Sequence, residues 1–296
     1  MEDSCSSVRS SEIHYNDPKD QRCAPDKEFK NGSCFTLNGL IKMAESYNKK
    51  NNNKIVLKNG YEMVNPTKYK KYLLREFKKN IRKCDSQRCW LKQTFTEYLN
   101  EEDFDIVAKN TFRPEGPKGK FEWLNTIHID ETMKQYENLY TDFLFLGAVP
   151  MDFDDLPLLG IKDLKFDELV KNGKTKLGII FNLDEHYKSG SHWVGMFVDL
   201  KKGEIRYFDS YGIIADKRVR KLVRRISDYL KKQNIEPIVG YNKVRHQYEG
   251  SECGVYSINF ILRMLAGDDF DDICNNKVAD KEVNQCRKVY FTNPNF

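Results

Sequence analysis

The 296-residue sequence predicts an α+β fold with one mixed sheet. Apolar runs of strand length recur after residue 140, and runs with helical spacing stand among them. A Lys201-Lys202-Gly203 turn joins two of the apolar runs as an antiparallel hairpin. Mixed helices and strands with an antiparallel hairpin are typical of the α+β class. The expected strands are residues 143–150, 177–182, 192–200, 204–208 and 237–244.

Composition narrows the class of protein. At 40% hydrophobic and 12% aromatic residues the chain can bury a core, and a net charge of +5 permits an acidic partner without arguing for one. Eight cysteines are too sparse for a disulfide scaffold. The first residues lack the features of a secretory signal, and no stretch of about 18 apolar residues occurs. We therefore expect no membrane span, a reducing cytoplasmic setting, free thiols, and no metal or cofactor.

The N-terminal part of the chain is expected to be mainly helical. Residues 1–30 are polar and charged, and we predict that they are poorly ordered. Apolar residues from Phe35 to Tyr47 recur at helical spacing, with Ser33 or Thr36 available as the cap.

A basic amphipathic helix is predicted over residues 67–83, where lysines and arginines oppose an apolar face. We interpret the basic face as solvated, which is the usual role of a charge run. The alternative is an electrostatic binding surface for nucleic acid, although the sequence contains no specific nucleic-acid-binding motif.

Cys84 and Cys89 form a single Cys-x4-Cys pair. Because no second pair follows at zinc-finger spacing, a structural role beside Trp90 is favoured over zinc. Further on, residues 113–120 hold two prolines and two glycines among charges, which is typical of a linker. The sequence therefore predicts an accessory domain, residues 1–118, and a main domain, residues 119–296.

The main domain is predicted to contain a helix near residues 129–140, an amphipathic helix over 216–232 and a helix over 255–266. The last is apolar nearly all round, as buried helices are, and Cys253 lies just before it. A thiol at the first turn of a helix lies near unpaired N–H groups and the positive end of the helix dipole, which favour the thiolate. The alternative is an inert buried cysteine.

A nucleophilic cysteine needs a base and a group that orients that base. Of five histidines, His192 is the best placed, because it opens an apolar strand. The chain then folds back at residues 200–203, so Asp209 is expected beside His192 at the end of the returning strand. On this spacing alone a structural histidine is the commoner outcome, but a helix-initial cysteine with Gln247 six residues before it strengthens the catalytic interpretation. The other candidates are His14, His128, His186 and His246.

These residues resemble a known family, the cysteine peptidases that process ubiquitin-like proteins (the SUMO proteases) and their viral relatives. Seventeen positions separate His192 from Asp209, as in SUMO proteases and adenain. The resemblance covers about residues 120–291 and looks strongest for polyprotein-processing proteases of large nucleocytoplasmic DNA viruses, including those of African swine fever virus and mimivirus-like viruses. The segments that carry it are His192-Trp193, Asp209, Gln247, Cys253-Gly254, Trp123-Leu124-Asn125, Cys84 to Cys89, Arg245 to Gln247 and Cys286 to Phe291.

The resemblance implies a papain-like, SUMO-protease-like core and a role for each site residue. Cys253 would be the nucleophile, His192 its base and Asp209 the orienting acid, while Gln247 would help to hold the oxyanion. It also implies that Trp193 and an opposing Trp123 narrow the approach, so that cleavage follows Gly-Gly. Core packing is the alternative for both tryptophans.

The resemblance further implies viral polyprotein or core-protein substrates, and a location in the virion and at assembly sites in the host cytoplasm. Adenain is activated by DNA and a peptide, so the basic helix over 67–83 predicts stimulation by nucleic acid. Three alternatives remain open: a protease of host ubiquitin or SUMO conjugates, a clan-related acetyltransferase, and a binding module built on an idle protease.

Overall fold

The computed structural model describes residue 5 and residues 21–292, and its contacts divide the chain into two compact units. One unit is Ser11–Pro114, and the other is Met1–Ser10 with Glu115–Phe296. The division falls within the segment predicted as a linker. That segment is more packed than a linker, because an added Cβ at Gly116 would lie 2.5 Å from the Phe291 ring. The poorly ordered start predicted over residues 1–30 lies outside the described residues, apart from Cys5 and residues 21–30.

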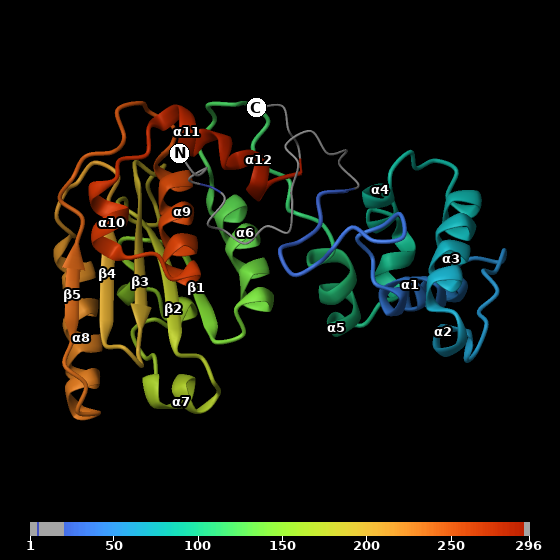
Figure 1. The fold of residues 1–296 in the computed structure, drawn as a ribbon, viewed down its shortest axis with the longest axis horizontal. Coiled ribbons are helices and arrows are strands. Elements are labelled where there is room, and N and C mark those ends of the chain that lie inside the picture. The colour runs from blue at the N-terminus through green and yellow to red at the C-terminus, as the bar shows by residue number, and fades with distance from the viewer. Residues whose placement is uncertain (1–4, 6–20, 293–296) are drawn as a thin grey trace. The chain divides into compact units, whose positions relative to one another are not determined.

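The Ser11–Pro114 unit is helical (Figure 1), and aromatic side chains form much of the core of its described residues. Phe77 stacks on both Trp90 and Phe95, and Tyr47 meets Phe77 edge-on. Helix α1 begins after Thr36, whose Oγ1 accepts the Gly39 N–H at 3.0 Å, so this cap is as predicted. The elements are α1 (Leu37–Lys50), α2 (Tyr61–Val64), α3 (Pro66–Asn80), α4 (Gln87–Leu91), a 3-10 turn (Thr94–Tyr98) and α5 (Glu101–Phe104), which a π turn (Asp105–Lys109) continues.

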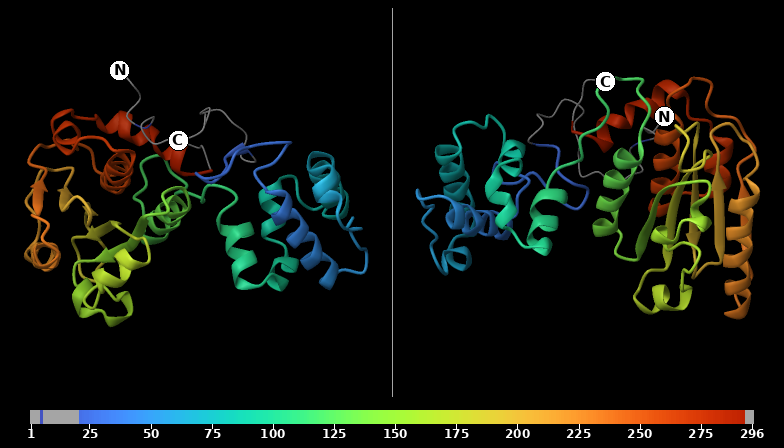
Figure 2. Two further views of the ribbon diagram at one scale, coloured as in Figure 1. Left: turned by 60° about the horizontal axis from the view of Figure 1, so that its bottom comes forward. Right: turned by 180° about the vertical axis from the view of Figure 1, so that it is seen from behind.

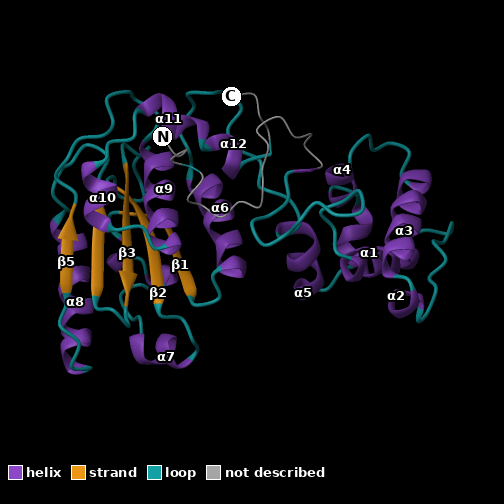
Figure 3. Cartoon of the chain, viewed as in Figure 1, coloured by secondary structure: helices purple, strands orange, loops and turns teal. Residues whose placement is uncertain are grey.

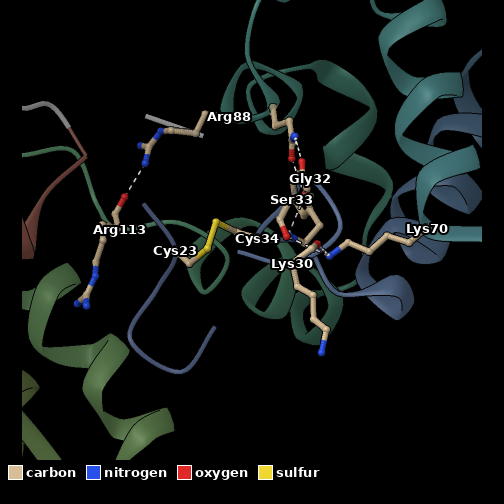
Figure 4. The surroundings of a disulfide bond; sticks show 10 residues. Cys23, Lys30, Gly32, Ser33, Cys34, Lys70, Arg88 and Arg113 are labelled. Carbon is tan, nitrogen blue, oxygen red and sulfur yellow. Dashed lines mark hydrogen bonds between the residues drawn. A yellow bond between two sulfur atoms is a disulfide. The ribbon is translucent and has the colours of Figure 1, made fainter. Parts of the chain in front are cut away.

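One lysine of the basic helix α3 is structural. Lys70 is buried, and its Nζ donates to the carbonyls of Lys30 at 2.6 Å and Ser33 at 3.0 Å (Figure 4). Burial and the nearby Lys30 charge lower the pKa of Lys70. These bonds hold the loop that the Cys23–Cys34 disulfide also closes. The other basic residues of α3 are exposed, namely Lys68, Lys71, Arg75, Lys78 and Lys79.

The prediction of free thiols is wrong for six of the eight cysteines. The disulfides join Cys5 to Cys286, Cys23 to Cys34 and Cys84 to Cys89. Cys253 and Cys274 are free and buried. Cysteine counting could not find these pairs, because the Cys5–Cys286 partners stand 281 residues apart and only the fold brings their Cα atoms to 5.5 Å.

The Glu115–Phe296 part of the chain forms a five-stranded mixed sheet in the order β1-β2-β3-β4-β5 (Figure 3). Strands β2, β3 and β4 are antiparallel, while the edge strands β1 and β5 run parallel to their neighbours. This confirms the α+β class. The strands are β1 (Phe143–Pro150), β2 (Lys176–Asn182), β3 (Trp193–Asp199), β4 (Glu204–Phe208) and β5 (Ile238–Tyr241).

Helices cover both faces of this sheet (Figure 2). The apolar stripe of α8 (Lys217–Lys232) joins the core formed by Ile179, Met196 and Ile205. Helix α9 (Cys253–Ala266) packs on the opposite face, where Gly195 lets the Phe260 ring approach β3 closely. Twelve of the fourteen α9 residues are buried, which agrees with its predicted all-round apolarity.

The remaining helices complete the unit. Helix α6 (Thr126–Leu139) packs on β1, and α7 (Phe166–Lys171) precedes β2. Two 3-10 turns (Phe153–Asp155 and Pro157–Leu159) follow β1, and α10 (Phe270–Asn275), α11 (Asp280–Gln285) and α12 (Arg287–Tyr290) follow α9. Among the described residues, no helix combines the length and apolarity needed to cross a membrane.

Strand β5 is shorter than predicted, because the chain turns away after Tyr241. The Asn242 side chain donates to the carbonyls of Asp209 and Val244 and accepts the Val244 N–H. The Asn242 N–H still donates to the Tyr207 carbonyl at 2.9 Å, and the side-chain bonds then turn the chain into the loop that leads to Cys253.

Candidate active site

The site begins where β3 starts and β4 ends. The two strands are antiparallel with Gly195 opposite Phe208, so His192 and Asp209 meet at one end of the sheet. His192 Nε2 lies 2.7 Å from Asp209 Oδ1. Both side chains are buried, with 8% and 1% of their surface exposed. The hairpin geometry thus produces the predicted pair.

The Asp209 carboxylate is held in place by the backbone that follows it. The Tyr211 N–H donates to the same Oδ1 at 2.8 Å, and the Asp209 carbonyl accepts the Gly212 N–H and the Asn242 side chain, each at 2.8 Å. A fixed carboxylate fixes the ring that it holds. Because the Nε2 atom of His192 bonds to Asp209, Nδ1 is the ring nitrogen that remains for the Cys253 thiol.

Cys253 is the first residue of α9, two residues earlier than the sequence predicts for that helix, and it is buried. Its thiol interacts with His192 and contributes to the raised pKa of that imidazole. Burial opposes a charge on His192, but the hydrogen bonds and charges of Asp209 and Cys253 outweigh it and raise the pKa of His192 to about 9. The imidazole is therefore protonated at neutral pH, next to the Cys253 thiol.

Gln247 lies in the same loop as Cys253 and is completely buried. Its Oε1 accepts the Ser210 hydroxyl at 2.6 Å, and its Nε2 donates to the Glu249 carbonyl at 2.8 Å. The Ser210 carbonyl also accepts the Gln247 N–H at 2.9 Å. The Gln247 amide is thus fixed between the turn that follows Asp209 and the loop that precedes Cys253.

The two tryptophans differ in their surroundings. Trp193 is buried, and its indole N–H donates to the Leu124 carbonyl at 2.8 Å. Leu124 in turn lies over the start of α9, since an added Cβ at Gly254 would meet its side chain at 3.1 Å. Trp123, the neighbour of Leu124, is 47% exposed. The 123–124 segment therefore lies beside the start of α9, with Trp123 exposed to solvent.

The other described histidines have structural partners. His246 is buried and donates through Nε2 to the Cys274 carbonyl at 3.0 Å, and burial lowers its pKa. His128 accepts the Asn125 N–H at the start of α6. His186 pairs with Asp152 at 2.5 Å. His14 lies outside the described residues.

Two further side chains lie at the site, Tyr211 and Arg245, and of these only Arg245 stands in a segment that carries the family resemblance. Tyr211 stacks on His192, with ring centroids 4.4 Å apart and planes 13° from parallel. Arg245 lies over the rings of both Tyr211 and Tyr248, at 5.3 and 4.8 Å. Burial and the negative charge of Cys253 raise the pKa of Tyr211. Only its position two residues after Asp209 could have drawn attention to Tyr211.

No group of three or more histidine, cysteine or acidic side chains in residues 21–292 is arranged to hold a metal ion. The site brings together a thiol, an imidazole and a carboxylate, which are the groups that nucleophilic catalysis by a cysteine uses, namely Cys253, His192 and Asp209.

Two comparisons decide the family. Residues 174–291 match the Ulp1 protease family, C-terminal catalytic domain. A protein of Acanthamoeba polyphaga mimivirus that is assigned as a thiol protease is 40% identical over 283 residues, covering 92% of this chain and 93% of that protein. The chain belongs to the Ulp1 protease family.

Other relatives of this Ulp1-family protein are also viral. A SUMO-1 cysteine protease of African swine fever virus is 26% identical over 232 residues, covering 72% of this chain and 85% of that protein. The crystal structure of an African swine fever virus protease has the same fold, with a TM-score of 0.58 at 23% identity over 81% of this chain and 92% of the other. The chain is therefore a viral cysteine protease with a Ulp1-type fold, as the resemblance in its sequence implied.

Proposed function

We propose that this protease cleaves viral polyprotein or core-protein precursors, with Cys253 as nucleophile. The observation that carries the proposal is His192 held between Asp209 and the thiol, with its pKa raised to about 9. Such an imidazolium–thiolate pair is ready to attack a peptide carbonyl. The viral thiol-protease relatives make a viral precursor the first substrate to test.

The reaction is acyl transfer to water. The thiolate attacks the scissile carbonyl carbon, a C–S bond forms, and the oxyanion is held by the Cys253 N–H at the start of α9 and by the Gln247 amide. The imidazolium of His192 then gives its proton to the leaving amine as the C–N bond breaks. Neutral His192 takes a proton from a water molecule that attacks the thioester, and the acid product leaves with the thiolate restored.

Cleavage after Gly-Gly is part of the proposal. The buried Trp193 is anchored to Leu124 beside the nucleophile, and Trp123 next to it is exposed. A substrate backbone that passed between two indoles would be selected for small side chains. We place this activity in the virion and at assembly sites in the host cytoplasm, where precursors would be available.

The test is incubation of the purified protein with virion polyprotein precursors, followed by sequencing of the new N-termini. We expect new N-termini directly after Gly-Gly, and no cleavage by the Cys253→Ser variant. Cleavage of the precursor at sites unrelated to Gly-Gly would overturn the specificity, whereas cleavage by Cys253→Ser would overturn the nucleophile.

A second substrate class follows from the name of one relative, a SUMO-1 cysteine protease. SUMO and ubiquitin conjugates should therefore be tested in parallel with the precursors. Release of SUMO at a higher kcat/KM than precursor cleavage would make host conjugates the better assignment.

Stimulation by nucleic acid is tested on the exposed lysines of α3. We expect DNA at low salt to raise kcat/KM, and the increase to disappear when Lys71 and Lys78 are changed to glutamine. Activity that does not respond to DNA would count against this part of the proposal.

A further inference from the structure

Arg287, the first residue of α12, is completely buried. Its guanidinium donates to three oxygens: Nη1 to the Glu122 carbonyl at 2.8 Å, Nη2 to the Ser251 carbonyl at 3.0 Å and Nε to the Asn284 side chain at 2.5 Å. Burial lowers the pKa of Arg287 to about 10, against the opposing charges of Glu252, Cys253 and Glu122. The side chain therefore remains a cation at neutral pH, in the interior of the protein.

The contacts of Arg287 join two parts of the active site. Ser251 stands two residues before the nucleophile, and Glu122 comes directly before Trp123, in the segment that anchors Trp193. A guanidinium is a planar fork, so it can hold two carbonyls in a fixed relation where an ammonium, as a point charge, cannot. One side chain thus connects the nucleophile loop to the segment beside it.

The buried carboxylate of Glu252 completes this arrangement. It accepts the Ser251 N–H at 2.9 Å and the Ser251 hydroxyl at 2.6 Å. Ser251 is therefore held by an acid on its N–H side and by a cation on its carbonyl side. Burying a charge is unfavourable unless other groups compensate it. Arg287 is a buried cation that interacts electrostatically with Cys253, so we expect it to do more than fill space in the core.

We propose that Arg287 is a positioning residue of the protease. It fixes Ser251 relative to Glu122, which aligns the nucleophile with the Trp123 segment, and its charge favours the Cys253 thiolate. The inference rests on the proposed function, because it takes Cys253 as the nucleophile.

The test separates charge from geometry in the full-length protein. Cys253 alkylation by iodoacetamide is followed from low to high pH by peptide mass, and kcat and KM are measured on a Gly-Gly peptide. We expect Arg287→Gln to move the alkylation midpoint upward by about one pH unit, because a nearby opposite charge is lost. We expect Arg287→Lys to keep a midpoint close to that of the wild type while kcat falls about tenfold, because the fork is lost.

The control is Asn284→Ala, which removes one neighbour of Arg287 and leaves the contacts to Ser251 and Glu122. It should keep kcat within about twofold of the wild type, as a substitution that spares the bridging contacts. An Arg287→Gln protein with the wild-type midpoint and kcat overturns the proposal, and so does an Asn284→Ala protein as impaired as Arg287→Gln. If Arg287→Gln does not fold, the proposal is overturned by an Arg287→Lys protein whose kcat and KM equal those of the wild type.

Failure of the two proposals can be told apart. If the Cys253→Ser protein is active, Cys253 is not the nucleophile, and both the proposed function and the role of Arg287 are overturned. If the Cys253→Ser protein is inactive and the Arg287 variants behave as the wild type, only the role of Arg287 is overturned.

Discussion

Two histidine–aspartate pairs lie at the same end of the sheet. His192 and Asp209 meet at 2.7 Å, and His186 and Asp152 meet at 2.5 Å. They differ in burial, since the imidazole of His192 is 8% exposed and that of His186 is 53% exposed. They also differ in their neighbours, because Cys253 as well as Asp209 raises the pKa of His192.

The comparison teaches that a carboxylate does not by itself make a histidine catalytic. In the exposed pair, burial opposes the charge of Asp152, but hydrogen bonds from His186 outweigh it and lower the pKa of Asp152. That pair orders a loop, because Asp152 also accepts the His186 N–H at 2.9 Å. In the buried pair, the partner of the imidazole on its other side is a thiol, and low exposure strengthens each interaction.

The largest effect is expected from the members of the buried pair and their thiol. Cys253→Ser and His192→Ala should each lower kcat/KM at least about ten-thousand-fold, as losses of a nucleophile or base do. His186→Ala, the matched control, should leave kcat/KM within about twofold, since it is a partly exposed substitution away from the thiol. An inactive but folded His186→Ala protein would break the distinction between the pairs.

A second effect concerns pH. The pKa of His192 is raised from 6.5 to about 9, so the imidazole stays protonated through neutral pH and loses its proton as the pH rises through about 9. We expect kcat/KM to fall on the alkaline side near 9. Asp209→Asn should lower kcat about a hundredfold or more and move this limb to lower pH, because one group that raises the His192 pKa is gone.

The matched substitution in the exposed pair is Asp152→Asn. It should leave the alkaline limb where it is in the wild type, since His192 does not depend on that carboxylate. Rate measurements on a Gly-Gly peptide across the alkaline range decide the point. An alkaline limb shifted equally by both substitutions would contradict the comparison.

The smallest effect is expected from the ring that stacks on His192. Tyr211→Leu should lower kcat about two- to tenfold, because a stacked aromatic pair contributes about 0.5–1.5 kcal/mol. Tyr211→Phe keeps the stack and should retain most of the activity. Equal losses in both variants would assign the effect to the phenol hydroxyl of Tyr211. Comparing kcat in H2O and in D2O would check this assignment.

Much of the fold could be predicted from periodicity. The strand over 204–208, the turn at Gly203 and the helices α1 and α8 follow from local patterns that agree with the final packing. The hairpin also brings His192 to Asp209, because an antiparallel ladder places its two ends together.

The rest depends on contacts between distant residues. Arg287 reaches Glu122 across 165 positions, and Cys5 reaches Cys286 across 281. The stack of Tyr211 on His192 depends on the turn after β4, which no spacing rule describes. The early end of β5 likewise follows from one side chain, Asn242, that bonds backward to Asp209. Such features are set by tertiary structure, so local patterns contain no trace of them.

The Cys5–Cys286 bond makes the chain almost a closed ring. A single peptide cleavage anywhere between these residues opens that ring without separating the pieces. The protein would then migrate as one species on a non-reducing gel and as two after reduction. A protease that nicks itself, or is nicked by another copy, would therefore keep both fragments covalently together.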